Sequence, residues 1–255
     1  MNYSSYLVKN CTMRDSWIKH GSLTSTNSCI STLHKERMLD EGTIVIADYQ
    51  DGGRGLGDHA WSSNRGENLL MSMLLFPAFL SASEQFHLSR VASLALCDVL
   101  ETLDANPVIK WPNDILTNKG KIAGILIEHG ITAGKISHTV IGIGFNLNQT
   151  EFPLFKTPAS SLFMETGMKS VVMEVAELVE DALMRWYREL KEGRTVLLEE
   201  HYLDRLYRLG VPGVFRADDE VFEGCIRGVT NFGELKVECD GKIRVFAHGA
   251  ISMEL

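Results

Sequence analysis

The sequence predicts an α+β protein in which helices cover one face of an antiparallel or mixed β-sheet. Three apolar runs follow one another with turns between them, at residues 107–111, 121–128 and 137–143. Because no helical pattern separates these runs, they do not form a βαβ series. Two long segments, 83–103 and 171–190, carry apolar residues at the three- and four-residue spacing of helices that pack on a core.

A change of pattern near residue 209 predicts a second, smaller unit at the C-terminal end. Short strands with tight turns between them are expected there, at 214–216, 221–229, 234–239 and 242–246. Such a meander is typical of a small β-barrel. We therefore expect two domains, residues 1–208 and 209–255.

The N-terminal part shows little pattern over its first 20 residues. The first clear signal is a run of short hydroxyl and amide side chains at 23–28, which is typical of the N-cap of a helix. Alternatively, some of these hydroxyls face a polar ligand, because they donate and accept hydrogen bonds without carrying charge. The apolar run 43–47 then predicts a buried strand that leads into a glycine-rich loop.

The middle of the chain is expected to alternate between strands and helices. Residues 68–76 are strand-like, and Pro77 limits the extension of that strand. After the strand at 107–111, Pro112, Asn113 and Asp114 predict a turn. The helix at 171–190 is followed by the capping residue Gly193 and by a shorter helix at 196–206.

The composition limits the classes of partner. With 25 basic and 33 acidic residues the net charge is -8, so we expect no DNA partner. The most apolar run, 69–80, is too short to cross a bilayer, and the N-terminus lacks the apolar region of a signal peptide. The five cysteines are scattered and odd in number. These features predict a cytoplasmic protein with reduced thiols and no membrane partner.

Residues 49–61 form a loop in which four glycines surround Arg54 and a tryptophan closes the segment. Ordering four glycines costs conformational entropy and gives the core no side chains, so burial does not explain them. They allow the backbone to approach or to fold over a ligand. The alternative is a mobile surface hairpin.

Five polar side chains lie at strand ends or in adjoining turns: Arg54, Lys110, Asp114, Lys121 and Asn146. A lysine that opens an apolar strand is commonly a solvated edge residue. Two cations that reach one cavity, with glycine amides nearby, instead make a site for a phosphate or carboxylate. The motifs of P-loop proteins, zinc proteases and α/β-hydrolases are absent, and the dinucleotide fingerprint is incomplete.

Four motifs occur in an order that resembles the biotin–protein ligases. They are Gly53-Arg54-Gly55 with Trp61, the KWPND run 110–114, the KIAGILIE run 121–128 and the GIGFN run 142–146. The resemblance extends from about Leu23 to the C-terminus. It implies a fold related to class II aminoacyl-tRNA synthetases, with a mixed sheet backed by helices and a C-terminal SH3-like barrel. It also implies that ATP and biotin are substrates, with Mg²⁺, and that biotinyl-5′-adenylate transfers its acyl group to a lysine of a biotin carboxyl carrier domain.

The resemblance also assigns roles to individual residues. Ser25, Thr26 and Gln50 match positions that hydrogen-bond the ureido ring of biotin, and Arg54 matches the loop arginine that meets its carboxylate and the phosphate. Lys121 matches the catalytic lysine, with Arg54 beside it. The remaining matched positions on the biotin side are Asn27, Gly53, Gly55, Leu56 and Gly124. On the ATP side they are Trp61, Asn68 and Asn146, in addition to Arg54 and Lys121, and Asp114 is the candidate Mg²⁺ ligand.

The sequence departs from the family pattern inside the loop and at the N-terminus. The family often has further arginines in the loop, where this chain has Leu56 and His59, and Asp58 replaces a glycine. We therefore expect weaker retention of the adenylate. About 20 residues precede the hydroxyl-rich run, too few for an independent domain, so we expect a short form without the DNA-binding repressor domain.

Two other functions stay open on the sequence alone: a lipoate-type acyl-adenylating ligase, and a biotin-binding sensor without catalysis. The match around residues 110–114 weighs against the lipoate enzyme. Simple binding of biotin does not require both Arg54 and Lys121 for charge stabilisation, which weighs against the sensor. The sequence leaves open which carboxylase is the acceptor and whether the chain forms a homodimer.

Overall fold

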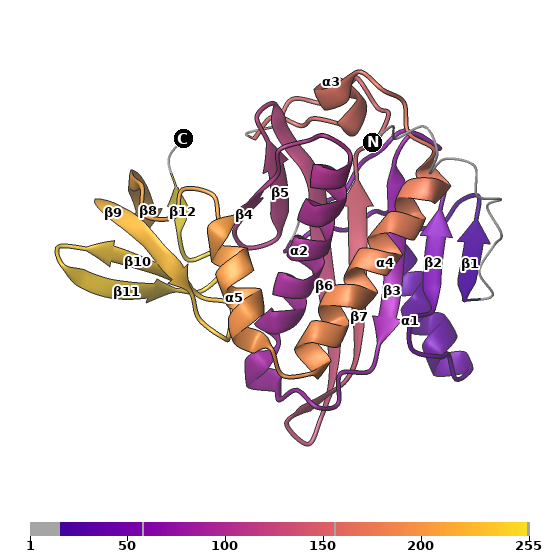
Figure 1. The fold of residues 1–255 in the computed structure, drawn as a ribbon, viewed down its shortest axis with the longest axis horizontal. Coiled ribbons are helices and arrows are strands. Elements are labelled where there is room, and N and C mark those ends of the chain that lie inside the picture. Colours follow the sequence, from indigo (N-terminus) through magenta and orange to yellow (C-terminus); the bar gives the residue numbers. More distant parts are fainter. Residues whose placement is uncertain (1–15, 58, 156, 254–255) are drawn as a thin grey trace.

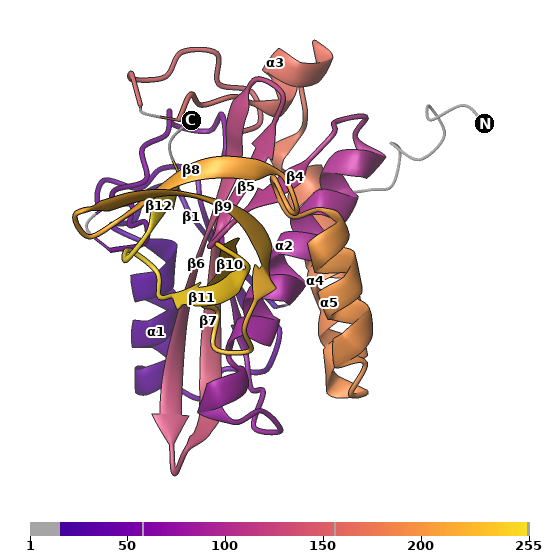
Figure 2. The same ribbon diagram turned by 90° about the vertical axis from the view of Figure 1, so that its left-hand side faces the viewer.

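The computed structural model of the protein describes residues 16–57, 59–155 and 157–253. A seven-stranded sheet lies between helix α1 (Thr26–Glu36) on one face and helices α2 (Phe86–Thr102) and α4 (Val172–Lys191) on the other, as Figures 1 and 2 show. Helix α5 (Thr195–Asp204) packs on α2 and α4. The predicted α+β class, with helices backing a sheet, is confirmed.

The large sheet is mixed, as predicted. Its order is β1-β2-β3-β7-β6-β5-β4, with β1 parallel to β2 and all other neighbours antiparallel. The strands are β1 Trp17–His20, β2 Ile44–Ala47, β3 Leu69–Leu75, β4 Val108–Lys110, β5 Asp114–Thr117, β6 Gly120–Thr132 and β7 Lys135–Phe145.

Two of these strands correct the prediction. Strand β1 lies within the first 20 residues, which show little pattern in the sequence, and it pairs in parallel with β2. Strand β5 begins at Asp114, a residue that we placed in a turn. Both strands have four residues and mix polar with apolar side chains, so neither an alternating pattern nor an apolar run stands out in the sequence.

The helices follow their sequence signals closely. Ser25 is the N-cap of α1, and its hydroxyl accepts a hydrogen bond from the backbone N–H of Ser28. Helix α2 is preceded by a short 3₁₀ turn, Ala82–Glu84, and is buried on most sides because the sheet, α4 and α5 surround it. A short helix, α3 (Leu162–Thr166), ends at Gly167 in the left-handed conformation. Among the described residues no helix is both long and apolar enough to cross a bilayer.

The C-terminal strands form a five-stranded antiparallel sheet, which confirms the predicted small β unit. Its order is β11-β10-β9-β8-β12, and β11 and β12 are its edges. The strands are β8 Pro212–Ala217, β9 Glu220–Val229, β10 Leu235–Cys239, β11 Lys242–Phe246 and β12 Ser252–Met253, the last of which was not predicted. The sheet is strongly curved (Figure 2), and its buried apolar side chains, such as Phe215 and Val237, belong to the core.

The two sheets share contacts close to the functional region. The indole nitrogen of Trp111 donates to the carbonyl of Gly233 at 2.8 Å. Gly233 packs so closely on Phe86 that a Cβ atom at this glycine would lie 2.7 Å from the ring. Buried residues of both parts, such as Phe86 and Phe215, belong to one continuous core. The domain boundary between residues 208 and 209 stays a prediction.

Candidate active site

A cavity of about 690 Å³ opens at the N-terminal end of α1, over strands β6 and β7. Its wall combines the first turn of α1, the glycine loop, the turn between β4 and β5, the segment 152–159 and a residue after β11, His248. These segments are far apart in the sequence. The sheet brings them together because β6 and β7 lie next to β5 on one side and β3 on the other.

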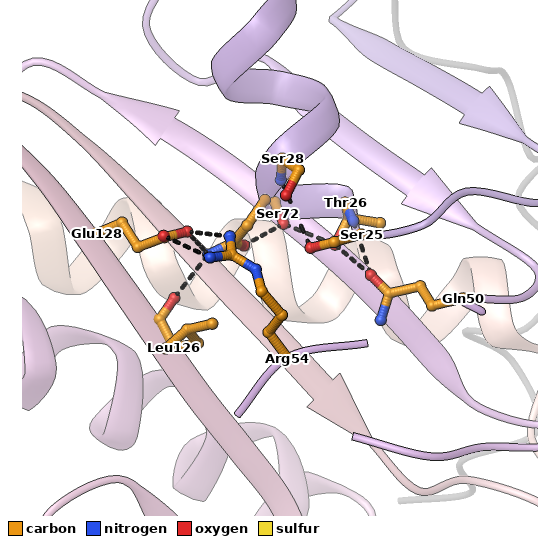
Figure 3. Close-up of polar contacts among 9 residues, drawn as sticks. Ser25, Thr26, Ser28, Gln50, Arg54, Ser72, Leu126 and Glu128 are labelled. Carbon is orange, nitrogen blue, oxygen red and sulfur yellow. Dashed lines mark hydrogen bonds and ion pairs between the residues drawn. The ribbon is translucent and has the colours of Figure 1, made fainter. Parts of the chain in front are cut away.

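Neutral side chains of α1 and Gln50 line part of the cavity and are held by a hydrogen-bond network behind the wall (Figure 3). The Oε1 atom of Gln50 accepts from the backbone N–H of Thr26 at 2.7 Å and from its hydroxyl at 3.1 Å. The Ser72 hydroxyl lies 2.7 Å from the Thr26 hydroxyl and 2.6 Å from Oδ1 of Asn27. These bonds fix the orientation of polar groups that are buried at the cavity wall, as a neutral polar ligand requires.

Ser25 satisfies both interpretations of the hydroxyl-rich run. Its side chain caps α1, and the same residue lines the cavity together with Thr26 and Asn27. The residue that starts helix α1 therefore lies at the cavity wall together with the first turn of that helix.

The glycine loop is a short hydrogen-bonded hairpin. Arg54 and Ala60 form a bridge between its two arms, and the N–H of Trp61 donates to Gly53 at 2.9 Å. A Cβ atom at Gly53 would lie 2.3 Å from the carbonyl oxygen of Trp61, so this position requires glycine for close approach of the arms. The hairpin places Arg54, Gly55 and other loop residues, Leu56 and His59 among them, at the cavity wall. Asp58 lies outside the described residues.

Arg54 forms a two-pronged ion pair with Glu128 of β6 (Figure 3). Its two terminal nitrogens donate to the two carboxylate oxygens at 3.0 and 2.8 Å. The side chains are 46% and 38% exposed, so solvent screens the pair.

Lys121 and Asp114 form a second ion pair in the cavity, with Nζ 2.6 Å from Oδ1. The lysine opens β6, as expected, and its backbone is held by hydrogen bonds to Pro158 and Ser160. Its ammonium also lies 5.6 Å from the centre of the Trp61 ring, within the range of a cation–π contact. Lys121 is therefore a positioned cation inside the site rather than a solvated edge residue.

The indole of Trp61 lies directly on glycines of the sheet. A Cβ atom at Gly144 would be 2.3 Å from the indole, and one at Gly124 would be 2.9 Å from it. The indole nitrogen and Oδ1 of Asn146 are buried without a hydrogen-bond partner among the described residues. Both residues line the cavity, so an unsatisfied donor and an unsatisfied acceptor are present in one wall.

Two predicted site residues lie outside the cavity lining. Asn68 is 1% exposed, and both ends of its amide are used: the nitrogen donates to Gln149 at 2.6 Å and the oxygen accepts from the backbone of Leu147 at 2.9 Å. The structure therefore gives Asn68 a role in fixing the chain after β7, and its match to a position near the phosphates stays a prediction. Gly53 shapes the hairpin without lining the cavity.

The structure adds three residues that the sequence analysis did not assign to the site. Ser72 and Glu128 complete the network around Asn27, and His248 lines the cavity from the C-terminal part. Burial and the neighbouring His59 lower the pKa of His248, against the opposite effect of Asp114. A serine inside the apolar run 69–75 is a signal that could have identified Ser72, whereas nothing in the local sequence marks His248.

The sequence and the structure are both similar to known biotin ligases. The model of the Biotin/lipoate A/B protein ligase family matches residues 21–146. The bifunctional ligase/repressor BirA of Bacillus subtilis is 31% identical over 93% of this chain and 74% of its own length. The biotin–[acetyl-CoA-carboxylase] ligase of Paracoccus denitrificans is 33% identical over 77% of this chain and 84% of its own.

Among solved structures, the biotin protein ligase from Aquifex aeolicus in complex with biotin and ATP has a TM-score of 0.78 to this protein. The two chains are 25% identical, and the match covers 94% of this chain and 99% of the other. With the matches in sequence, this similarity shows that the chain belongs to the biotin–protein ligase family.

Proposed function

We propose that the protein is an ATP-dependent biotin ligase that activates biotin as biotinyl-5′-adenylate and transfers it to a lysine of a carboxylase. The observation that carries this function is one cavity whose wall combines neutral and cationic groups. Buried neutral amides and hydroxyls line it beside α1, Arg54 reaches it from the loop, and Lys121 reaches it from β6, paired with Asp114 beside Trp61. Biotin has matching groups, with an uncharged polar ring at one end and a carboxylate at the other.

At the neutral part of the wall, Ser25, Thr26, Asn27 and Gln50 are proposed to bind the ureido ring. Their groups are fixed by the network before the ligand arrives, so little ordering is required on binding. A ring that both donates and accepts hydrogen bonds suits this wall better than an apolar dithiolane ring does. This difference favours biotin over lipoate.

Among the charged groups, Lys121 is proposed to act on the reaction itself. A carboxylate oxygen of biotin attacks the α-phosphorus of ATP, the bond to the β-phosphate breaks, and pyrophosphate leaves. The Lys121 ammonium stabilises negative charge on the α-phosphate and acyl oxygens during this step. In the second step the neutral amine of the acceptor lysine attacks the acyl carbon, and AMP leaves.

For the adenine end, Trp61 and Asn146 are the proposed contacts. A purine ring can stack on the indole. Its amino group can donate to the unsatisfied amide oxygen of Asn146. Arg54 and Lys121 complete the proposed ATP contacts, and Asn68 is left out because its amide is engaged with the protein.

Mg²⁺ is proposed to enter with the nucleotide. Across the described ranges no three His, Cys, Asp or Glu side chains gather as a metal-ligand group. Asp114 is the carboxylate in the cavity lining, and Lys121 pairs with one of its oxygens. A single carboxylate fits an ion held mainly by phosphates, which is the usual environment of nucleotide-bound Mg²⁺. When bound, the ion would withdraw charge from those phosphates.

The proposed protein partner is a biotin carboxyl carrier domain, and a homodimer stays a hypothesis. Adenylate formation can be tested without the carrier, by following biotin-dependent exchange of labelled pyrophosphate into ATP, with lipoate in a parallel reaction. Exchange that requires biotin supports the ligase. Exchange with lipoate alone would identify the lipoate-type enzyme, and tight binding of biotin without exchange would identify the sensor.

A further inference from the structure

Glu128 connects the charged loop to the buried network, although it lies outside the cavity lining. Its carboxylate accepts two hydrogen bonds from Arg54 and a third, at 2.7 Å, from Nδ2 of Asn27 (Figure 3). Glu128 is therefore the contact through which the loop arginine meets the first turn of α1.

Asn27 determines where this carboxylate lies. The side chain is 3% exposed, its Oδ1 accepts from Ser72, and its amide nitrogen also donates to the carbonyl of Leu126 at 3.2 Å. A Cβ atom at Gly142 would lie 2.1 Å from Oδ1, so the amide fills the space that this glycine leaves. An immobile amide thus fixes Glu128, and Glu128 in turn fixes the guanidinium of Arg54, whose own backbone lies between two glycines.

We propose that Glu128 is a positioning residue that holds Arg54 at the edge of the cavity in the ligand-free enzyme and competes with an anionic ligand for it. This inference rests on the proposed function, in which Arg54 meets the carboxylate of biotin. A two-pronged pair occupies one edge of the guanidinium, so a ligand carboxylate that takes the same edge must displace Glu128.

The competition has a consequence for binding. When the ligand carboxylate binds Arg54, the Arg54–Glu128 pair is broken, and this cost reduces the net free energy of binding. Because the pair is partly exposed, the cost is modest and corresponds to about two- to five-fold in affinity. A neutral ligand of the same shape does not compete for Arg54, so Glu128 lowers the affinity for the anion only.

The test compares biotin with its neutral alcohol analogue by isothermal titration calorimetry. Glu128→Gln removes the charge but keeps an oxygen that can accept from Asn27. We expect this variant to bind biotin about two- to five-fold more tightly than wild type and to bind the alcohol with unchanged affinity. Glu223→Gln, which removes one charge from the exposed face of β9, is the matched control and should change neither affinity.

A second comparison shows whether Glu128 acts through Arg54. In an Arg54→Gln background, Glu128→Gln should no longer change the affinity for biotin. The inference is overturned if Glu128→Gln weakens or leaves unchanged the binding of biotin, if it alters both ligands equally, or if its effect persists without Arg54. Absence of biotin binding in the wild type would overturn the proposed function as well, so the two failures are distinguishable.

Discussion

Lys121 carries the positive charge that the proposed chemistry places closest to the transferred acyl group. Its ammonium is already positioned by Asp114 and by the face of Trp61. A cation held in place costs no reorganisation when charge develops in the transition state, which is why such groups act on rate more than on ground-state affinity.

Lys121→Ala is expected to slow adenylate formation on the order of 10²–10³-fold while biotin binding stays comparatively intact. Single-turnover formation of labelled biotinyl-adenylate and equilibrium binding of biotin measure the two effects separately. Lys119→Ala is the matched control, because Lys119 is a neighbouring lysine that bonds the backbone of Met164 outside the cavity. A parallel loss of binding and rate would contradict a role in the transition state.

Arg54 is expected to retain the activated intermediate. Arg54→Gly should let biotinyl-adenylate escape and label lysines of other proteins indiscriminately, because the loop loses its charged contact with the ligand. Leu56→Arg, which restores a second loop arginine, should slow the escape. Release of adenylate after rapid dilution measures both effects. Arg65→Ala serves as the control, since Arg65 contacts Gly21 and Tyr49 instead of the cavity.

At the scale of elements, the glycine hairpin is the part expected to respond to ligand. Its arms are joined by few hydrogen bonds and by the solvent-screened Arg54–Glu128 pair. Segments with so few buried contacts open locally at low cost. Ligand contacts would offset the entropy of ordering the hairpin.

Limited proteolysis should therefore cut residues 52–66 faster in the free protein than in the presence of biotin or its adenylate. A general protease with fragment mapping by mass spectrometry locates the cuts. Equal cleavage rates in both states, at saturating ligand, would rule out a lid that closes on the substrate.

The β6–β7 hairpin contains a half-buried histidine, His129, that makes stability depend on pH. Burial, together with the nearby His138, lowers the pKa of His129 to about 4. An unfolded histidine has a pKa of about 6.5, so between these values the unfolded chain binds more protons. The contribution of neutral His129 to the free energy of unfolding is therefore fully present above pH 6.5 and is lost as the pH falls toward 4.

Urea unfolding at pH 7 and pH 5 tests this assignment. Because of this histidine, the free energy of unfolding should be lower at pH 5 than at pH 7 by on the order of 2 kcal/mol. His129→Gln, whose amide can replace the hydrogen bond to Thr139, should show a smaller loss than wild type. An identical loss in both proteins would show that His129 does not titrate as inferred.

The accuracy of the sequence predictions follows how clearly the apolar residues of each element stand out. Strands β6 and β7 and helices α2 and α4 are long enough for their apolar periodicity to identify them. Strands β1, β5 and β12 are short and mix polar with apolar side chains, so they were missed, whereas the equally short β2 and β4 were predicted from their apolar runs. A different limit applies to Ser72. Its place beside Asn27 follows from its register opposite Gly142, which the sequence does not specify.

At the scale of the whole molecule, the site depends on parts of the chain that no local motif connects. The motifs around Arg54, Lys121 and Asn146 each contribute residues to the cavity wall. His248 could not be predicted, because it reaches the cavity only when the C-terminal sheet packs beside Trp111. The sequence also does not reveal that Gln149 and Leu147 occupy the amide of Asn68.

The proposed reaction uses the whole molecule, because two substrates must meet in one cavity and the product must then be transferred to a carrier. The most direct measurement combines the purified protein with ATP, Mg²⁺, labelled biotin or labelled lipoate, and an apo carrier domain with its acceptor lysine. We predict ATP-dependent labelling of that lysine by biotin, no labelling by lipoate, and none when the acceptor lysine is replaced. Labelling by lipoate, or saturable biotin binding without adenylate or labelled carrier, would contradict the account.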